Sequence, residues 1–258
     1  MNMEETTGKK SPVKNVLNYG LPIAGFLLLW ELAGLQSPVL PTPVETVQKI
    51  GYMFSHKVAG KLLYQHIGRS LFRMLAGLII GVGIGVPFGI FMGYSRKMEA
   101  LAKYLFEAFR MIPALAWIPL SILFFGISEF GKVFIIIIAA FVPAVINSWR
   151  GVRLVDEDVI VAARILGAGS RTILRRVILP SALPSIYAGI QYAVSISWMC
   201  ILAAELVGAG EGIGYLILYG MEIPDDAMIA AGMILIGIIG FGFSQILRSL
   251  EGVLTPWK

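Results

Sequence analysis

Long apolar runs, separated by short polar segments, dominate the pattern of residues along this chain. A run of about 17 to 25 mostly apolar residues has the length that crosses the hydrocarbon core of a bilayer as an α-helix. The chain contains six candidates, although prolines interrupt the short third one. We therefore expect an all-α integral membrane protein with about six transmembrane helices, over residues 19–35, 71–94, 111–126, 133–149, 186–207 and 227–247.

The first two runs carry additional signals. The polar start with Lys9, Lys10 and Lys14 would also suit a cleaved signal peptide, but Trp30 and Glu31 occupy the place where small residues should mark the cleavage site. We therefore interpret the first run as a span that stays in the protein. The second run is rich in glycine, and small residues at this spacing let helices approach closely. It should lie buried among other helices.

The composition agrees with lipid as the solvent around this chain. Hydrophobic residues make up 57% of the 258 residues and charged residues only 14%, whereas a soluble domain carries about a quarter charged residues. The single cysteine, Cys200, lies inside an apolar run and therefore provides neither a disulfide framework nor a thiolate metal site. The net charge of +5 reflects topology in a membrane protein rather than affinity for nucleic acid.

The distribution of charge between loops predicts the orientation. With the N-terminus inside, the inner segments are residues 1–18, 95–110, 149–183 and 248–258, and they hold 15 of the 21 Lys and Arg residues. The loop 208–226 has neither Lys nor Arg. This asymmetry follows the positive-inside rule, so we expect a multi-pass protein with both termini in the cytoplasm.

The outer loop after the first run predicts a short helix. Thr42, Pro43 and Glu45 have the spacing of a capping box with proline at the first helical position, and the helix should run towards His56. The only histidines, His56 and His66, both fall in this predicted outer loop. A two-histidine metal site is one interpretation, but we favour solvated or structural histidines and expect no metal site.

The longest inner loop, residues 149–183, begins with a predicted short helix. Acidic residues from Asp156 to Asp158 precede an apolar segment over residues 159–166, and Gly167 follows it. Acidic residues at the start and glycine after the end are typical of a properly terminated helix.

A second helix should follow in the same loop. It would begin at Ser170 and end at Leu179, because Pro180 and Pro184 come next. The apolar side chains of both helices indicate a protein partner or a membrane interface. The alternative to a partner is a basic amphipathic helix on the anionic leaflet, touching lipid through Arg171, Arg175 and Arg176.

Ala162-Ala163, Gly167 and Leu179-Pro180 have a spacing that resembles the EAA loop of ABC-importer permeases. That family has Glu-Ala-Ala, three residues, Gly, nine residues and then Ile-x-Leu-Pro; here Val161 and Val177 replace the usual Glu and Ile. The resemblance implies a coupling helix that docks into a groove of a cytoplasmic ATPase. The residues expected at this contact are Asp158, Val161, Ala162, Ala163, Gly167, Ala168, Leu179 and Pro180.

Further motifs extend the resemblance over nearly the whole chain. They are Trp30-Glu31-Leu32, Leu40 to Pro43, Ile112 to Leu120, Phe124 to Ile127, Ala203-Ala204-Glu205 and Gly212 to Leu216. As a set they resemble permeases of the nitrate, sulfonate and taurine type. This implies the type I ABC-importer permease fold and import, by alternating access, of a small anionic solute such as nitrate, taurine, an alkyl or aryl sulfonate or a related organic anion.

The resemblance also implies the bacterial inner membrane as the location, a domain organisation and an assembly. Residues 1–66 would form an N-terminal tail, the first span and an outer amphipathic segment, residues 67–247 the transmembrane core, and residues 248–258 a cytoplasmic tail. The expected partners are a second copy of this chain, ABC ATPase subunits, an extracytoplasmic solute-binding protein and the lipid bilayer, but no nucleic acid.

Catalytic and nucleotide-binding motifs are absent from the sequence. It contains no G-x-x-x-x-G-K-[ST], no H-E-x-x-H and no G-x-S-x-G. We therefore expect no catalytic residue and no cofactor in this chain, with ATP and Mg²⁺ bound by the partner ATPase. The candidates for lining a solute pathway are Gln191, Ser195, Ser197, Trp198 and Glu205. Packing between helices would equally explain the first four, and for Glu205 we favour structural anchoring over solute contact.

Three other classes of protein remain as alternatives. A secondary transporter driven by an ion gradient is the strongest, but such folds usually show internal repeats and ionisable groups at the bilayer midplane, and we find neither in this sequence. A membrane enzyme would need a set of catalytic residues, and the sequence contains no such motif. A structural scaffold would leave the long capped inner loop unexplained.

Overall fold

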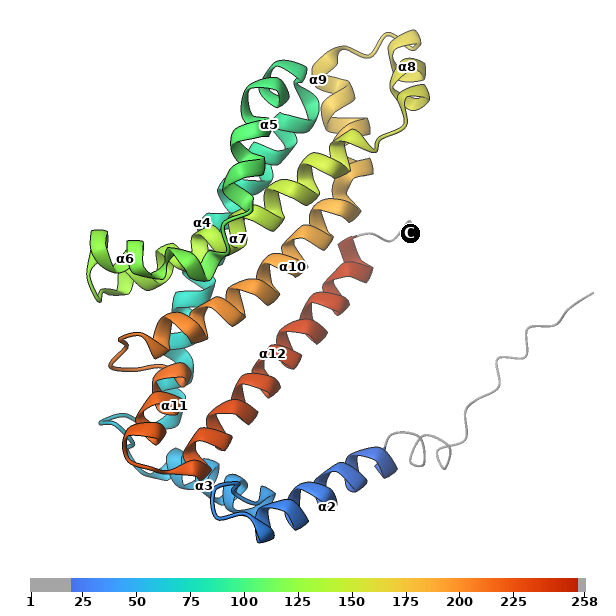
Figure 1. Ribbon diagram of the computed structural model, residues 1–258. Helices are drawn as coiled ribbons and strands as arrows, with labels where there is room; N and C mark the ends of the chain where they lie inside the picture. Colours follow the sequence, from blue (N-terminus) through green and yellow to red (C-terminus); the bar gives the residue numbers. More distant parts are fainter. Residues whose placement is uncertain (1–19, 255–258) are drawn as a thin grey trace, which may run out of the picture.

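Helices make up the computed structural model, which describes residues 20–254, with no strand among them. The predicted polar start with Lys9, Lys10 and Lys14 lies outside the described residues. The all-α prediction is confirmed. The helices, labelled in Figure 1, are α2 (Leu21–Gln36), α3 (Pro43–Ser55), α4 (Leu63–Tyr94), α5 (Arg96–Arg110), η2 (Ala114–Trp117), α6 (Ile118–Phe125), α7 (Glu129–Arg153), α8 (Glu157–Ile165), α9 (Ser170–Ile173), η3 (Leu174–Ile178), α10 (Leu179–Leu206), α11 (Ile213–Glu222) and α12 (Asp226–Leu254).

Four helices are long and apolar enough to cross a membrane: α4, α7, the continuous helix Ser170–Leu206 and α12. They confirm the second, fourth, fifth and sixth predicted spans. Each continues beyond its apolar run; the 32 residues of α4 extend about 48 Å, well beyond a hydrocarbon core of roughly 30 Å. The ends of these helices therefore reach out of the lipid core.

The third predicted span, residues 111–126, is not a straight helix. α5 and the segment Ala114–Phe125 meet at an angle of 85°, as in a broken span or a re-entrant loop. Pro113 lies at this corner, where a proline removes a backbone N–H and blocks continuation of the preceding helix. α5, expected in an inner loop, is one arm of this bent pair. Among residues 20–254, four helices have the length and hydropathy of a span, or five if the bent pair is one span, and Leu21–Gln36 is a shorter apolar helix.

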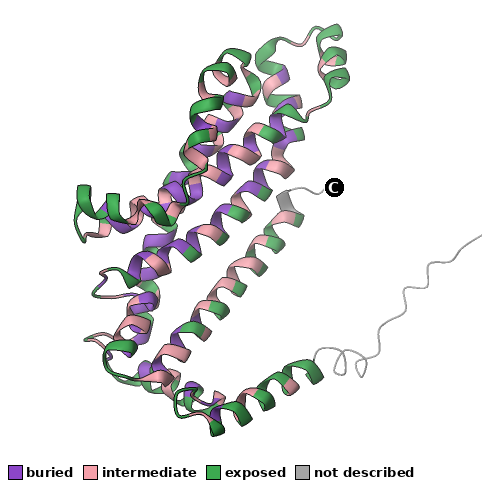
Figure 2. Ribbon diagram, in the orientation of Figure 1, coloured by how far each residue is buried: buried purple, intermediate pink, exposed green. Residues whose placement is uncertain are grey.

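The first predicted span is helix α2, which is short and stands apart. Its 16 residues extend about 24 Å, less than the thickness of the hydrocarbon core. Figure 1 shows α2 leaning away from the other long helices, and Figure 2 shows it exposed along nearly its whole length. Trp30 Nε1 donates a hydrogen bond to Pro41 O over 3.0 Å, which ties α2 to the turn before α3.

Glycines allow the closest packing in the bundle, where α7 lies between α4 and α10. A Cβ atom on Gly81 of α4 would lie 2.6 Å from Ile137 O, and one on Gly89 would lie 2.4 Å from Val145 O. These distances are too short for real Cβ atoms, so α4 and α7 meet backbone to backbone. The prediction that the glycine-rich run is buried is confirmed for this face of α4.

The predicted capping box is present at α3. Thr42 Oγ1 accepts a hydrogen bond from the Glu45 N–H over 3.2 Å, and Glu45 Oε2 accepts one from the Thr42 N–H over 2.8 Å. The helix ends at Ser55, with His56 as its C-cap, as the sequence predicted. α3 and α11 lie at one end of the bundle, which we call the α11 end; α8 and α9 lie at the other, the α8 end (Figure 1).

Candidate functional site

Helix α8 projects from the α8 end of the bundle as a separate short helix (Figure 1). Its N-cap is Asp156, whose Oδ1 accepts a hydrogen bond from the Asp158 N–H over 2.9 Å. The helix starts at Glu157 rather than Val159, because the acidic residues form its first turn instead of preceding it. Acidic residues in the first turn interact favourably with the helix dipole. Local residues are therefore sufficient to define where this helix begins.

Gly167 reverses the chain after α8. Its φ is +82°, a backbone conformation that costs an ordinary residue about 1 to 2 kcal/mol. The Gly167 N–H donates to Arg164 O over 2.9 Å, and the Ala168 N–H donates to Ala163 O over 3.0 Å, which satisfies the last carbonyls of the helix. A Cβ atom on Gly167 would meet nothing within 4 Å. The requirement for glycine is therefore one of backbone conformation and not of space.

One side of α8 is covered and the other is free. Ile160, Ala163 and Ala168 are half-buried against a cluster that includes Ile173 and Ile178. No residue of α8 is fully buried. The apolar side chains of Val159, Val161, Ile165 and Leu166 are exposed by 49, 45, 81 and 87% respectively. Four uncovered apolar side chains on a projecting helix form a surface suited to a protein partner.

The predicted coupling residues divide between these two sides. Val161, Ala162 and Gly167 are exposed, as is Asp158, whereas Ala163 and Ala168 turn towards the bundle. Leu179 and Pro180 lie further along the chain, at the start of α10. The structure therefore does not place all eight residues on one surface.

The prediction that a helix ends at Leu179 is wrong. η3 is a π-helical turn in which the Leu179 N–H donates to Leu174 O, five residues back. α10 then continues through Pro180, directly after this wide turn, and through Pro184 inside the helix. Ser170 is likewise the first residue of α9 rather than its cap, which is Gly169. The segment from α9 to α10 is thus one continuous helix with a wide turn in it.

Two of the predicted pathway residues line a polar cavity between α10 and α12. Gln191 and Ser195 share this cavity of about 410 Å³ with Ser244, Arg248 and Glu251, and Leu247 closes one side. Gln191 Nε2 donates to Glu251 Oε2 over 3.1 Å, and Ser195 Oγ donates to Gln191 O over 3.1 Å. The cavity offers both a cationic and an anionic group to a small polar solute.

Ser197 and Trp198 instead lie in the packed interior. Ser197 is fully buried. Trp198 Nε1 donates to Ile236 O over 3.2 Å, and its ring lies 5.5 Å from that of Phe243. Trp198 therefore joins α10 to α12, as the interhelical packing alternative expected.

Glu205 lies in a buried charge cluster at the α11 end. Its Oε1 accepts a hydrogen bond from Arg73 Nη1 over 2.8 Å, and Arg73 also binds Glu129 through two hydrogen bonds of 2.7 Å. The side chains of Arg73 and Glu205 are fully buried. Since a buried charge is tolerated only when paired and hydrogen-bonded, Glu205 holds α10 to α4 and α7.

The same cluster caps the start of α11 with side chains from other helices. The Gly214 N–H donates to Glu205 Oε2 over 3.0 Å, and the Ile213 N–H to Ser70 Oγ over 2.9 Å. The Gly212 N–H donates to His66 Nδ1 over 3.1 Å. Helix N-termini leave such N–H groups without partners inside their own helix. α4 and α10 therefore fix where α11 begins.

The sequence from residue 85 to residue 258 matches the family described as binding-protein-dependent transport system inner membrane component. The chain belongs to this family. It is therefore a membrane permease component of a binding-protein-dependent transport system.

Relatives are similar in sequence to this permease along almost its whole length. A putative ABC transporter permease of Methanocaldococcus jannaschii is 37% identical and covers 94% of this chain and 92% of its own length. The taurine transport system permease TauC of Escherichia coli is 35% identical, over 88% of this chain and 84% of its own. The bicarbonate transport system permease CmpB of Synechococcus elongatus is 34% identical, over 90 and 87%.

The fold of the permease also occurs among solved structures. An inward-facing form of the MetNI methionine ABC transporter has a chain that matches with a TM-score of 0.59 and 22% identity, covering 72% of this chain and 95% of its own. This likeness shows that the permease has the type I importer fold expected from its motifs.

The sequence analysis missed most of the charge cluster of the permease. Arg73 lies inside the apolar run 71–94, and an ionisable residue in a span is a signal in its own right. His66, expected in a loop, is fully buried in α4, with Nε2 bonded to Val58 O over 3.1 Å. Glu129 and Glu211, which also belong to the cluster, carry no motif, because only the fold brings them to Arg73.

Proposed function

We propose that this permease is the membrane subunit of an ATP-driven importer and that the exposed face of α8 is its contact with the ATPase. The uncovered apolar face of α8 is the observation that supports this contact most directly. The sequence has no phosphate-binding loop, so ATP and Mg²⁺ would be bound and hydrolysed in the partner, and this chain would need no cofactor of its own.

The orientation follows from the same contact. The α8 end would lie in the cytoplasm, where the ATPase is, and the α11 end would face the solute-binding protein. The inner loop that includes α8 carries six arginines, whereas the loop 208–226 has no Lys or Arg, as the positive-inside rule requires. With α2 as the first of six spans, both termini would lie on the cytoplasmic side, and a second copy of this chain would complete the permease.

Movement would pass from α8 to α10 through one continuous helix. α8 packs on Ile173 and Ile178, and these residues belong to α9 and η3, which continue into α10. A displacement of α8 by the ATPase would therefore shift the helix that carries Gln191 and Ser195. π-helical turns are frequent at functional sites and interrupt the regular helical ladder, so η3 is the natural place for this helix to bend during alternating access.

The solute would be a small organic or inorganic anion. The relatives include permeases named for taurine and for bicarbonate and putative ones named for aliphatic sulfonates, and all these solutes carry a negative group. Arg248, Ser195 and Ser244 would contact the anion in passing, while Glu251 prevents tight binding. Ser197, Trp198 and Glu205 would support the pathway from the interior instead of lining it.

The test compares Gly167→Asp with Gly169→Asp in the same loop. Gly169 has an ordinary φ of −72° and, like Gly167, open space at its Cβ position. Gly167→Asp should abolish uptake of radiolabelled taurine or another sulfonate by cells that also express the ATPase and binding protein, because the turn after α8 is strained. The protein should remain in the membrane, and Gly169→Asp should retain most of the uptake.

Purification of the tagged chain from its own membranes completes the test. An ATPase subunit should accompany the wild-type chain and the Gly169→Asp variant, but not Gly167→Asp. Normal uptake by Gly167→Asp would refute the role of α8. Uptake that needs no ATPase and stops when the ion gradient is collapsed would point to the secondary transporter.

A further inference from the structure

The α8 end carries positive charges that no acidic side chain within residues 20–254 pairs with. Arg96, Lys97, Arg171, Arg175 and Arg176 are exposed, and none of them forms an ion pair with any residue that the structure describes. Arg153, by contrast, pairs with Glu99. An unneutralised set of guanidinium and ammonium groups is a surface for an anionic partner.

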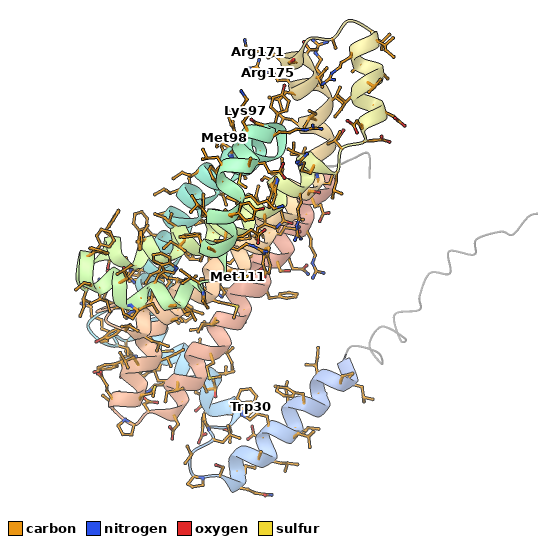
Figure 3. The ribbon with its side chains drawn as sticks, turned by 45° about the horizontal axis from the view of Figure 1, so that its top comes forward. Trp30, Lys97, Met98, Met111, Arg171 and Arg175 are labelled. Carbon is orange, nitrogen blue, oxygen red and sulfur yellow. The ribbon has the colours of Figure 1, made fainter. Side chains whose placement is uncertain are left out.

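Three of these cations lie on one edge, which we call the basic edge. Lys97 belongs to the first turn of α5, Arg171 to α9 and Arg175 to η3. Figure 3 shows Lys97, Arg171 and Arg175 along the same margin of the structure, on the side of α9 away from α8. Tyr94 Oη lies 3.5 Å from Ser170 O, so the corner between α4 and α5 touches the beginning of α9.

A cavity of about 250 Å³ lies on the α8 side of α9, away from the basic edge. Its lining includes Glu157, Ile160 and Arg164 of α8, together with Arg96 and Arg153. Because the cavity contains a carboxylate and Arg153 already pairs with Glu99, it is not part of the basic edge.

Apolar side chains continue from the basic edge along the bundle. Leu101, Tyr104 and Leu105 of α5 are exposed by 72, 78 and 74%, and Phe91 in the last turns of α4 by 62%. An amphipathic helix with this arrangement, cationic at one end and apolar along its face, suits the boundary between headgroups and acyl chains. A soluble acidic protein would leave these apolar side chains without a contact.

We propose that the basic edge binds an anionic phospholipid, whose phosphate lies between Lys97, Arg171 and Arg175 and whose acyl chains lie along Leu101, Leu105 and Phe91. The cytoplasmic leaflet is rich in anionic lipids that attract clustered Lys and Arg. Two of the three cations belong to the segment between α8 and α10. A bound lipid would therefore hold the helix through which α8 acts on the solute pathway.

The first experiment measures retained lipid and does not depend on transport. The full-length chain, with whatever subunits accompany it, is purified in mild detergent and titrated with phosphatidylglycerol, and bound lipid is counted by native mass spectrometry. The triple variant K97Q/R171Q/R175Q should bind phosphatidylglycerol roughly 100-fold more weakly, because each basic residue near an anionic surface contributes about five-fold. The matched control K57Q/K103Q/R150Q removes the same charge at exposed positions outside the basic edge and should bind like the wild type.

The second experiment measures ATPase activity stimulated by the binding protein in nanodiscs of phosphatidylcholine with and without phosphatidylglycerol. Wild type should be more active with phosphatidylglycerol, and the triple variant should lose that difference. Equal phosphatidylglycerol binding by wild type and triple variant would overturn the proposal. So would stimulation by free inorganic phosphate alone, which would indicate a soluble anion, or selective loss of the ATPase subunit from the triple variant, which would indicate a protein contact. If the triple variant does not fold, an absence of phosphatidylglycerol binding to wild type overturns the proposal equally.

Discussion

At the residue scale, the buried carboxylate of Glu205 at the α11 end depends on the glycines packed against it. Glu205 accepts hydrogen bonds from Ser70, Arg73 and the Gly214 N–H, and a carboxylate so placed is fully satisfied without water. The approach is close enough that a Cβ atom on Gly212 would lie 2.3 Å from Glu205 Cδ. Gly212 and Gly214 therefore leave free the space that the Glu205 side chain occupies.

Gly212→Ala should destabilise the permease strongly. Its φ of +128° disfavours any side chain, and the added methyl group would displace Glu205 from Arg73. Separating a buried ion pair costs about 3 to 5 kcal/mol, which is a large fraction of the roughly 5 to 15 kcal/mol that stabilises an ordinary domain. The measurement is the temperature at which the purified chain loses its monodisperse size-exclusion peak. The control is Gly210→Ala, which has open space around it and should change stability by less than about 0.5 kcal/mol.

The charge cluster also shows where sequence reasoning stops at this scale. Glu205 could be singled out because it interrupts an apolar run, and anchoring was the favoured role. Arg73, Glu129 and His66 could not be connected to Glu205, since long stretches of chain separate them from it and no local pattern relates these segments. Charge pairing between distant helices is a property of the fold, whereas caps such as Thr42 with Glu45 are local and were predictable.

At the element scale, the contact between α4 and α7 depends on the face that each α4 glycine occupies. Gly89→Ala should weaken the bundle, because its Cβ would overlap Val145 O and overpacking costs about 1 to 3 kcal/mol. Gly83 has open space at its Cβ position. Gly83→Ala should therefore stabilise α4 slightly, by up to about 1 kcal/mol, because alanine has the higher helix propensity. Thermal unfolding of both variants in the same detergent is the measurement. Equal effects of the two substitutions would contradict backbone contact between α4 and α7.

Elements were predictable where a single periodic pattern decides them. The apolar runs of α4, α7, α10 and α12 and the capped helix α8 needed no tertiary information. Prolines were misjudged in both directions. Pro113 breaks the third run into an 85° corner, while α10 continues both through Pro180, which directly follows the wide turn of η3, and through Pro184 inside the helix. The sequence alone does not reveal which groups donate hydrogen bonds to the backbone carbonyls one turn before each proline.

At the scale of the whole molecule, α2 is the element with the least support from its own chain. Leu21, Phe26, Leu29 and Leu35 are exposed by 64 to 70%, and α2 packs mainly on α3. Lipid or the proposed second copy would cover this surface. The bundle from α4 to α12 does not need α2 for its own packing.

A chain that begins at residue 37 should therefore fold but lose self-association. The expected result is a monomer by light scattering in detergent, with a thermal unfolding midpoint close to that of the full chain. The control replaces Leu21, Leu29 and Leu35 by Ala, which keeps α2 helical and should weaken association only partly. An unfolded or aggregated truncated chain would contradict this prediction, as would a truncated chain that still forms dimers.

The charge cluster also has a consequence for the order in which the protein is made. Arg73 enters the membrane 56 residues before Glu129 and 132 residues before Glu205. At 5 to 20 residues per second, the ribosome needs roughly 7 to 26 seconds to synthesise the second partner after Arg73. During that interval the guanidinium of the nascent α4 has at most Glu129 to neutralise it. The buried charge pair that joins α4 to α10 is therefore completed only after α10 has been synthesised.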